Sequence, residues 1–153
     1  MTSKGRKLTD PGEGLLRRVR KTPRVTYNPI VDQTTGHTRA PAAAFEPRFF
    51  NPAKPDAIFV DEALSVNVQS LLIAACLPLT WGADFRKHYV ARITVADCTS
   101  QGLEAYHHPL LPENPHHGLI WGLVETHGID EDRYERVIDA LARASTIVPG
   151  SGA

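Results

Sequence analysis

Long apolar runs are missing from this sequence of 153 residues. The longest one covers only Leu71 to Leu77, whereas a membrane-spanning helix needs about 20 consecutive apolar residues. The basic N-terminal residues are not followed by an apolar signal region, so secretion is not expected. We therefore expect a cytoplasmic protein that does not associate with membranes.

Cysteine is also scarce. Cys76 and Cys98 are the two cysteines, and they stand in apolar or strand-like surroundings without the spacing of a metal site. We expect both thiols to be buried as small apolar groups, and we expect neither a metal nor a cofactor. The remaining composition is ordinary for a globular protein, and its length indicates one domain, over residues 15–148.

The sequence has no net charge, but its charge is unevenly distributed. Residues 1–24 carry eight Lys or Arg side chains against two acidic ones, whereas the rest of the chain has an excess of acidic side chains. A basic segment can bind phosphates. We expect residues 1–14 to form a flexible basic tail, residues 149–153 to form a second flexible tail, and nucleic acid to bind, if at all, only through residues 1–24.

Apolar periodicity predicts an α+β fold, with a small, mostly antiparallel sheet and two helices packed on it. The β-branched segments 89–96 and 118–124 are predicted to be strands that pair with each other. A first helix is predicted over about 67–76, with Ser65 or Asn67 as its N-cap. The clearest helix covers about 131–145, and one apolar stripe is expected to face the core: Tyr134, Val137, Ile138, Leu141 and Ala142.

Shorter segments are less distinctive. Leu15 to Val19 is too short an apolar run to distinguish a strand from a helical turn. Asp32 to Gly36 is typical of a turn or a hairpin tip. Residues 40–57 combine four prolines with phenylalanines, which indicates an ordered irregular loop, and residues 57–60 resemble a short strand.

The chemically densest stretch is 107–118, which contains four of the seven histidines and three of the twelve prolines. One histidine of each adjacent pair could bind a metal, although the helical two-histidine spacing is absent. The stretch could instead orient a ligand or act as a general acid and base, or it could simply connect two strands. The sequence also has no Gly-x-Ser-x-Gly or phosphate-loop motif. The candidate binding residues are His108, Asn114, His117, Ser65 and Arg17.

Several short motifs occur in an order that resembles a group of small, uncharacterised bacterial proteins. They are Leu15-Leu16-Arg17, Ala44-Phe45-Glu46-Pro47, Leu64-Ser65-Val66 and Asn114-Pro115-x-His117. The resemblance covers about residues 15–124. It departs at His108, where the group has an acidic residue, and at Leu110-Leu111, where one leucine is extra. It implies a bacterial cytoplasmic protein and points to Ser65, Asn114 and His117, but it brings no activity or cofactor.

Two functions follow as expectations. The first is a non-catalytic binding or accessory module of a bacterial intracellular system, in which loop 107–117 contacts a protein partner or a small ligand. The alternative is a small enzyme, for example a transferase of the ADP-ribosyltransferase kind that consumes nicotinamide dinucleotide. In that case Arg17 or Arg18 would orient a phosphate, Ser65 would support the cofactor, and His117 or Glu125 would act on the ribose. This alternative is an analogy between folds.

Overall fold

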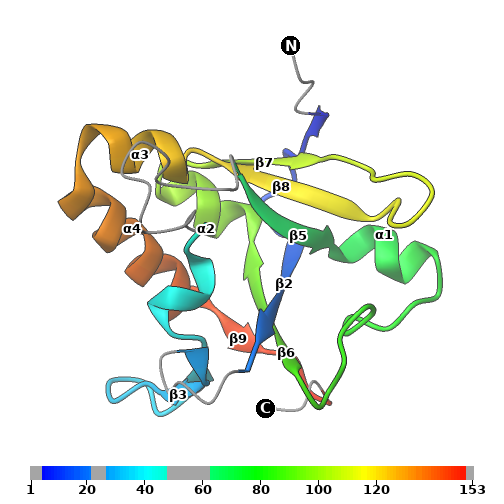
Figure 1. Ribbon diagram of the computed structural model, residues 1–153, viewed down its shortest axis with the longest axis horizontal. Helices are drawn as coiled ribbons and strands as arrows, with labels where there is room; N and C mark the ends of the chain where they lie inside the picture. The colour runs from blue at the N-terminus through cyan, green and yellow to red at the C-terminus, as the bar shows by residue number, and fades with distance from the viewer. Residues whose placement is uncertain (1–4, 22–26, 48–62, 151–153) are drawn as a thin grey trace, which may run out of the picture.

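A computed structural model describes residues 5–21, 27–47 and 63–150, and its main feature is a seven-stranded sheet (Figure 1). The strands follow the order β1-β7-β8-β5-β2-β6-β9, and every neighbouring pair is antiparallel. Two further short strands, β3 and β4, form a hairpin of their own. The strands are β1 (Arg6–Lys7), β2 (Gly14–Arg20), β3 (Ile30–Val31), β4 (Thr38–Arg39), β5 (Leu64–Val68), β6 (His88–Thr94), β7 (Glu104–His107), β8 (His117–Trp121) and β9 (Thr146–Ile147).

Four α-helices accompany the sheet in the described part of the chain, so the α+β class is confirmed but the prediction of only two helices is wrong. They are α1 (Gln69–Ala74), α2 (Val95–Ser100), α3 (Leu123–Ile129) and α4 (Glu131–Ala144), with the 3-10 helix η2 (Ala42–Phe45). The sequence predicted α4 well, and Asp130 caps it by accepting a hydrogen bond from the Arg133 amide. Its five predicted core residues are all buried. The helices α2 and α3 have only six and seven residues, too few for a clear apolar period.

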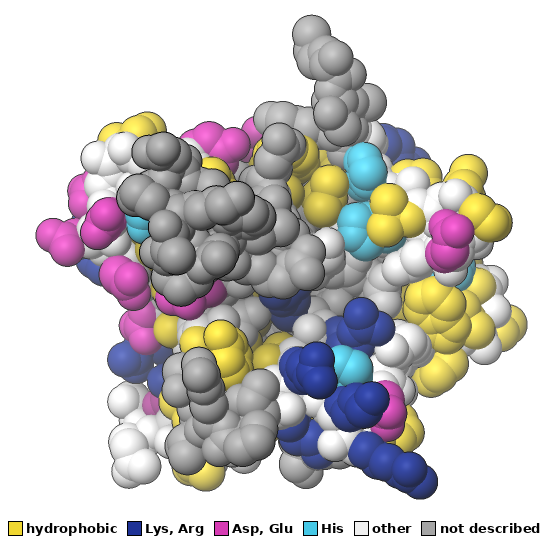
Figure 2. All heavy atoms as spheres, in the orientation of Figure 1, with side chains coloured by type: hydrophobic (Ala, Val, Ile, Leu, Met, Phe, Trp, Pro, Cys, Tyr) yellow, Lys and Arg dark blue, Asp and Glu magenta, His cyan; other side chains and the backbone are white. Residues whose placement is uncertain are grey.

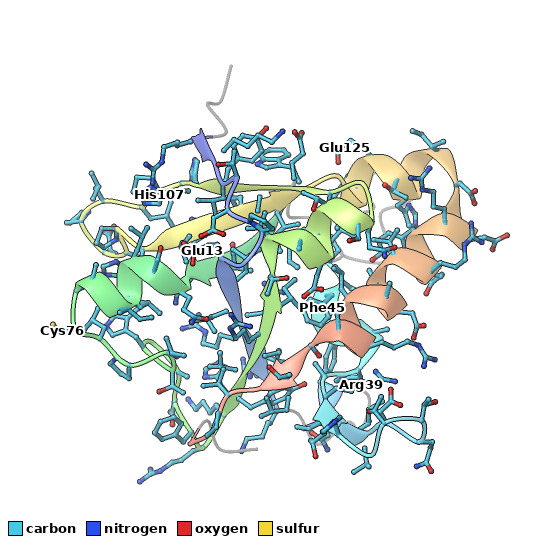
Figure 3. The ribbon with its side chains drawn as sticks, turned by 180° about the vertical axis from the view of Figure 1, so that it is seen from behind. Glu13, Arg39, Phe45, Cys76, His107 and Glu125 are labelled. Carbon is cyan, nitrogen blue, oxygen red and sulfur yellow. The ribbon has the colours of Figure 1, made fainter. Side chains whose placement is uncertain are left out.

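The main core lies on one face of the sheet. The register places Leu15 opposite Ile93 and Leu64 opposite Ile120, so these side chains share a face. Residues from α2, α3, α4 and η2 pack against them, and Phe45 of η2 lies beside α4 (Figure 3). Burial of this face holds the strand register, because a slip by one residue would turn every apolar side chain to the other side.

The opposite face carries a second, smaller core. Leu16 and Val90 point to this face and pack with Leu72 of α1 and with Val148. The chain that follows α1 adds partly buried apolar residues, among them Trp81. This cover lies at the end of β5 away from α3 and α4 (Figure 1). The described residues therefore cover the second face only in part, and a pocket lies beside this cover.

The predicted pairing of segments 89–96 and 118–124 is wrong. Strand β6 pairs with β2 and β9, whereas β8 pairs with β5 and β7. Two strands, β2 and β5, lie between β6 and β8. Both segments have ordinary strand composition, and composition does not specify which strands become neighbours.

The start of α1 also differs from the prediction. Ser65 and Asn67 belong to β5, and Val68 is the N-cap residue, without a side-chain capping bond. The first turn is held instead by Glu13, whose carboxylate accepts hydrogen bonds from the backbone amide and the hydroxyl group of Ser70. This contact joins residues that are 57 positions apart, so no local capping pattern could have predicted it.

Several shorter predictions concern the edges of the fold. Leu15 to Val19 is a strand, part of β2, and Asp32 to Gly36 is a hairpin tip in which Asp32 accepts bonds from the amides of Thr34 and Thr35. Part of the segment that we assigned to a basic tail is structured, because β1 pairs with β7. The predicted strand 57–60 and most of the proline-rich segment after Pro47 lie outside the described residues. In the described ranges, no helix has both the length and the apolar character needed to cross a membrane.

Candidate functional site

The candidate site is a pocket on the partly covered face of the sheet, at the junction of β2, β5 and β8. Its cavity volume is about 140 Å³. Trp81 and Gly82, from the chain after α1, and Asn114, from the loop before β8, line it from outside the strands of the sheet. The lining residues are Leu16, Arg17, Arg18, Ser65, Val66, Asn67, Trp81, Gly82, Asn114 and His117.

Strand β5 brings two polar side chains to this pocket. Leu64, Val66 and Val68 are buried, and the intervening Ser65 and Asn67 are exposed and partly exposed. Successive side chains of a strand point to opposite faces, so Ser65 and Asn67 share the pocket face. Asn67 lies opposite His117 of β8, which makes Ser65 the diagonal neighbour of His117 and puts it within reach of that long side chain.

Ser65, His117 and His108 form a connected chain of polar groups. The Nε2 atom of His117 lies 3.1 Å from the Ser65 hydroxyl oxygen, and its Nδ1 atom lies 2.8 Å from the His108 backbone carbonyl oxygen. A carbonyl can only accept, so Nδ1 must carry the proton. In the neutral ring Nε2 is then an acceptor, and the Ser65 hydroxyl donates to it. A hydroxyl, an imidazole and an orienting acceptor in this order form the arrangement that activates a serine nucleophile.

The environment of His117 favours its neutral form. Its side chain is only 7% exposed, and burial lowers the pKa of His117 below its ordinary value, with smaller lowering contributions from His108 and His107. The hydrogen bond to the His108 carbonyl works in the opposite direction but is the smaller effect. Near neutral pH the imidazole is therefore unprotonated, which is the state that can accept the proton of Ser65.

Two asparagine amides lie beside the serine. The Nδ2 atom of Asn114 donates to the Oδ1 atom of Asn67 at 2.8 Å, and the Oδ1 atom of Asn114 accepts from the His116 amide at 3.0 Å. These two bonds fix the orientation of the Asn114 amide. Because Asn67 accepts through its oxygen, its Nδ2 group is left to donate toward the pocket, and no bond from this group to another described residue is recorded. Asn67 is thus a donor on the same strand face as Ser65.

The neighbouring arginines have different positions. The β2 register places Arg17 on the core face, where its Nε atom donates to the Ala44 carbonyl and its Nη1 atom donates to the Ser65 carbonyl. Arg18 points to the pocket face and is exposed, and its Nη1 atom donates to the Gly82 carbonyl at 2.7 Å. Arg17 therefore holds the backbone that carries Ser65, whereas Arg18 presents its guanidinium group at the mouth of the pocket.

The structure brings four of the five candidate residues, Arg17, Ser65, Asn114 and His117, to one pocket. His108 is not a lining residue, but its ring packs edge-on against the His117 ring with centroids 5.8 Å apart. Its contact with Nδ1 of His117 uses the backbone carbonyl, which any residue at this position would supply.

The other histidines of loop 107–117 and Glu125, which the sequence also suggested, do not line the pocket. His107 binds the Pro115 carbonyl, and His116 packs edge-on against Trp81. Glu125 is exposed on α3, at the opposite end of the β7–β8 hairpin from His107 (Figure 3). None of the described residues that line the pocket is acidic.

The contribution of Asn67 and the wall formed by Trp81 were missed. The alternation of Leu64-Ser65-Val66-Asn67-Val68 was a usable signal for a strand with Ser65 and Asn67 on one face. It was masked by the helical spacing that begins at Val68. No sequence signal indicated Trp81, because its place depends on how the chain after α1 folds over Leu16 and Val90.

The described residues do not provide a set of ligands for a metal ion. Within residues 5–21, 27–47 and 63–150, no group of three or more His, Cys, Asp or Glu side chains is placed to hold a metal ion.

Of the two cysteines, Cys98 is buried as expected but Cys76 is exposed. The prediction for Cys76 is wrong because α1 ends at this point, and Cys76 follows the helix with a positive φ of 58°.

Comparison with protein-family models, with curated proteins and with solved structures finds no match for this chain. The geometry of the pocket is therefore the basis of the functional argument.

Proposed function

We propose that the protein is a small enzyme in which Ser65 is the nucleophile and His117 is its general base. The observation that carries the proposal is the connected set Ser65 Oγ, His117 Nε2, His117 Nδ1 and the His108 carbonyl oxygen, with separations of 3.1 Å and 2.8 Å. A buried, neutral, oriented imidazole beside an accessible serine hydroxyl is what nucleophilic catalysis requires. The reaction class is group transfer or hydrolysis at an electrophilic acyl or phosphoryl centre.

The proposed step conserves atoms and charge. The Ser65 oxygen forms a bond to the electrophilic centre while its proton passes to Nε2 of His117. The bond between that centre and the leaving group then breaks, and the leaving group takes the proton from Nε2. Water, or another acceptor alcohol, repeats the sequence with His117 as base and releases Ser65. General acid and base catalysis of this kind accelerates a step by about 10² to 10⁴.

Charge that develops on the electrophile needs donors nearby. The Nδ2 group of Asn67 lies on the same strand face as Ser65, and Arg18 lies at the pocket mouth. Preorganised donors of this kind stabilise a developing oxyanion more strongly than water does. The Asn114 amide supports the same reaction indirectly, because its bond to the Asn67 oxygen turns the Asn67 amino group toward the pocket.

The transferase that consumes nicotinamide dinucleotide is supported less well than a serine nucleophile. In that alternative His117 or Glu125 acts on the ribose, yet Glu125 is not among the lining residues of the pocket, and none of the described lining residues is acidic.

A second candidate function, binding of a partner by loop 107–117, is favoured by the apex of that loop. Leu110 and Leu111 are 44% and 72% exposed, and exposed apolar side chains on a structured loop are typical of contact sites. A photo-crosslinking amino acid at position 111 tests this candidate. The binding function predicts a crosslink to one partner, and the Leu110→Asp substitution should abolish this crosslink. Diffuse or absent crosslinks would exclude the binding function.

The catalytic proposal is tested with an organophosphorus fluoride, which reacts with activated serines without knowledge of the substrate. The Ser65 oxygen would displace fluoride from phosphorus, and mass spectrometry would locate the adduct on Ser65. We expect wild-type protein to react at least about 100-fold faster than His117→Asn. The Asn114→Ala variant should also react, but more slowly than wild type, since it loses the orientation of Asn67.

The control is Ser100→Ala, which removes another exposed serine hydroxyl that lies outside the pocket and bonds only to the Ala96 carbonyl of its own helix. It should leave the labelling rate at position 65 unchanged. Labelling that spreads over several serines, or a His117→Asn protein that reacts as fast as wild type while folded, would show that Ser65 is not activated. In that event the hydroxyl serves only to satisfy the buried imidazole.

A further inference from the structure

A cationic surface adjoins the pocket at the end of the β2–β6 pair. Arg18 and Arg20 are two residues apart on β2 and therefore point to the same face, and the register puts His88 of β6 opposite Arg20. Arg86 and Lys87 precede β6 directly and are exposed. Figure 2 shows Lys and Arg side chains gathered over this part of the molecule, with a histidine and few acidic side chains among them.

The described residues pair none of these four cations with a carboxylate. In the part of the chain that the structure describes, no ion pair joins Arg18, Arg20, Arg86 or Lys87 to an acidic side chain. Asp84, two residues before Arg86, uses one carboxylate oxygen to accept from the Arg86 amide. The positive charges of Arg18 and Arg20 act on the neighbouring His88. Burial is the main cause that lowers the pKa of His88, and both arginines lower it further.

Arg18 connects this surface to the catalytic pocket. Its Nη1 atom is fixed by the Gly82 carbonyl at 2.7 Å, so its planar guanidinium group is held at the pocket mouth with further N–H donors available. A held guanidinium group binds the oxygens of a phosphate in pairs, whereas a lysine offers only a point charge. Among the described residues, the polar groups that line the pocket around Ser65 are hydroxyl, amide, imidazole and guanidinium groups, so no described carboxylate would repel an anion there.

We propose that the substrate is a small molecule with two or more neighbouring phosphate groups, the first held by Arg18 beside Ser65 and the next over Arg20, Arg86 and Lys87. This inference rests on the proposed function, since it names the substrate class of the same site. The size of the cavity agrees with it. A volume of about 140 Å³ accommodates one phosphate-sized group next to Ser65, and the rest of the molecule extends over the cationic surface.

Inorganic pyrophosphate is the probe, titrated into the full chain at low ionic strength and followed by calorimetry and by the melting temperature. We expect saturable binding by wild type, a Kd raised about tenfold or more in Arg18→Met because a charge-assisted bidentate contact is lost, and a smaller increase in Arg20→Met. Arg136→Met removes one exposed charge from α4, which packs on the core face, and should change the Kd less than about twofold. Sodium chloride at equal ionic strength is the control for nonspecific screening.

Three outcomes overturn the inference. One is no saturable binding of pyrophosphate by folded wild type. Another is equal weakening by Arg18→Met and Arg136→Met, which would indicate diffuse attraction. A short single-stranded oligonucleotide that binds more tightly than pyrophosphate, with affinity rising with its length, would also overturn it and assign the surface to nucleic acid.

The design separates this inference from the catalytic proposal. Ser65→Ala should bind pyrophosphate like wild type, because the hydroxyl is not needed for the anion. Pyrophosphate should slow the labelling of Ser65 in wild type but not in Arg18→Met. If pyrophosphate binds and Ser65 is unreactive, the catalytic proposal fails and the anion site stands; if Ser65 is labelled and pyrophosphate does not bind, the reverse holds.

Discussion

The guanidinium group of Arg17 donates to the backbone carbonyl of Ser65 at 2.9 Å, at the point where β2 and β5 separate. These strands are paired only at Leu15 with Val68 and at Leu16 with Asn67. Beyond Leu16 the backbones of β2 and β5 are no longer paired, and the Arg17 side chain connects the two strands instead. The same side chain also donates to the Ala44 carbonyl of η2. The separation of the strands makes room for the pocket, and Arg17 keeps the separated β5 in place.

Replacement of Arg17 should therefore affect stability. In Arg17→Met the carbonyls of Ala44 and Ser65 lose a charged donor, and we expect the free energy of unfolding to fall by about 1.5–3 kcal/mol. Arg18→Met, one residue further along β2, should change it by less than about 0.5 kcal/mol because Arg18 is exposed. Urea denaturation measures both. Equal stability of the two variants would mean that Arg17 does not support β5.

Two glycines give a contrast between close packing and open space. A Cβ atom on Gly118 would lie 2.9 Å from the Tyr106 carbonyl oxygen and 3.0 Å from a methyl group of Val68, whereas one on Gly128 meets nothing within 4 Å. Gly118→Ala should cost about 1–3 kcal/mol, because β8 must shift between β5 and β7. Gly128→Ala lies in α3 and should stabilise the protein by about 0.5–1 kcal/mol.

The same two variants can also be compared by the rate at which Ser65 is labelled. Since Gly118 follows His117 directly, Gly118→Ala should also slow the labelling of Ser65, whereas Gly128→Ala should not. A Gly118→Ala protein with wild-type stability would show that the strands adjust without strain.

The fold was predictable where local pattern and tertiary structure agree. Helix α4 has a strong cap, a long apolar stripe and an acidic first turn, so the sequence specifies it without knowledge of its neighbours. The assignment of Ser65 to a helix cap failed because two periods compete around Val68, and the outcome depends on Glu13, which is distant in the sequence.

The site was predictable only as a set of residue types. Asn114 and His117 stood out because they occur in a stretch dense in proline and histidine, but the contact of His117 with Ser65 spans 52 positions. It exists because β8 pairs with β5, a strand order that no local feature of the sequence records. The different faces of Arg17 and Arg18 follow in the same way from the register of β2 with β6.

The buried ion pair between Asp32 and Arg39 should stabilise the hairpin of β3 and β4. The Oδ2 atom of Asp32 lies 2.8 Å from Nε of Arg39, and both side chains are at least 90% buried. Bonds from the Thr34 amide and from Arg39 are the two largest causes that lower the pKa of Asp32. Removing the charge leaves Arg39 without its partner, which is costly for a buried group.

We therefore expect Asp32→Asn to lower the melting temperature more than Asp139→Asn, which breaks the exposed pair with Arg143. The difference should shrink in acid. The stabilising contribution of Asp32 is present above its ordinary pKa, near 4, and is lost as the pH falls through the lower pKa of the folded state. A difference that stays constant down to pH 2 would assign the effect to packing rather than to charge.

The reactivity of Ser65 should follow the protonation of His117. Burial lowers the pKa of His117 in the folded protein, so Nε2 accepts the Ser65 proton at neutral pH and loses this ability once it is protonated. The labelling rate of Ser65 in wild type should be constant above about pH 6.5 and fall at lower pH. In His117→Asn the rate should be low and show no inflection.

The stability of the protein should also fall as the pH falls. The unfolded chain binds a proton at His117 near pH 6.5, before the folded protein does, so the stability present above this pH is lost as the pH falls toward the folded pKa. His88→Asn is the control, because the pKa of His88 is also lowered but its ring is not bonded to Ser65. This variant should keep the pH dependence of labelling, and loss of that dependence would transfer the role of base from His117 to His88.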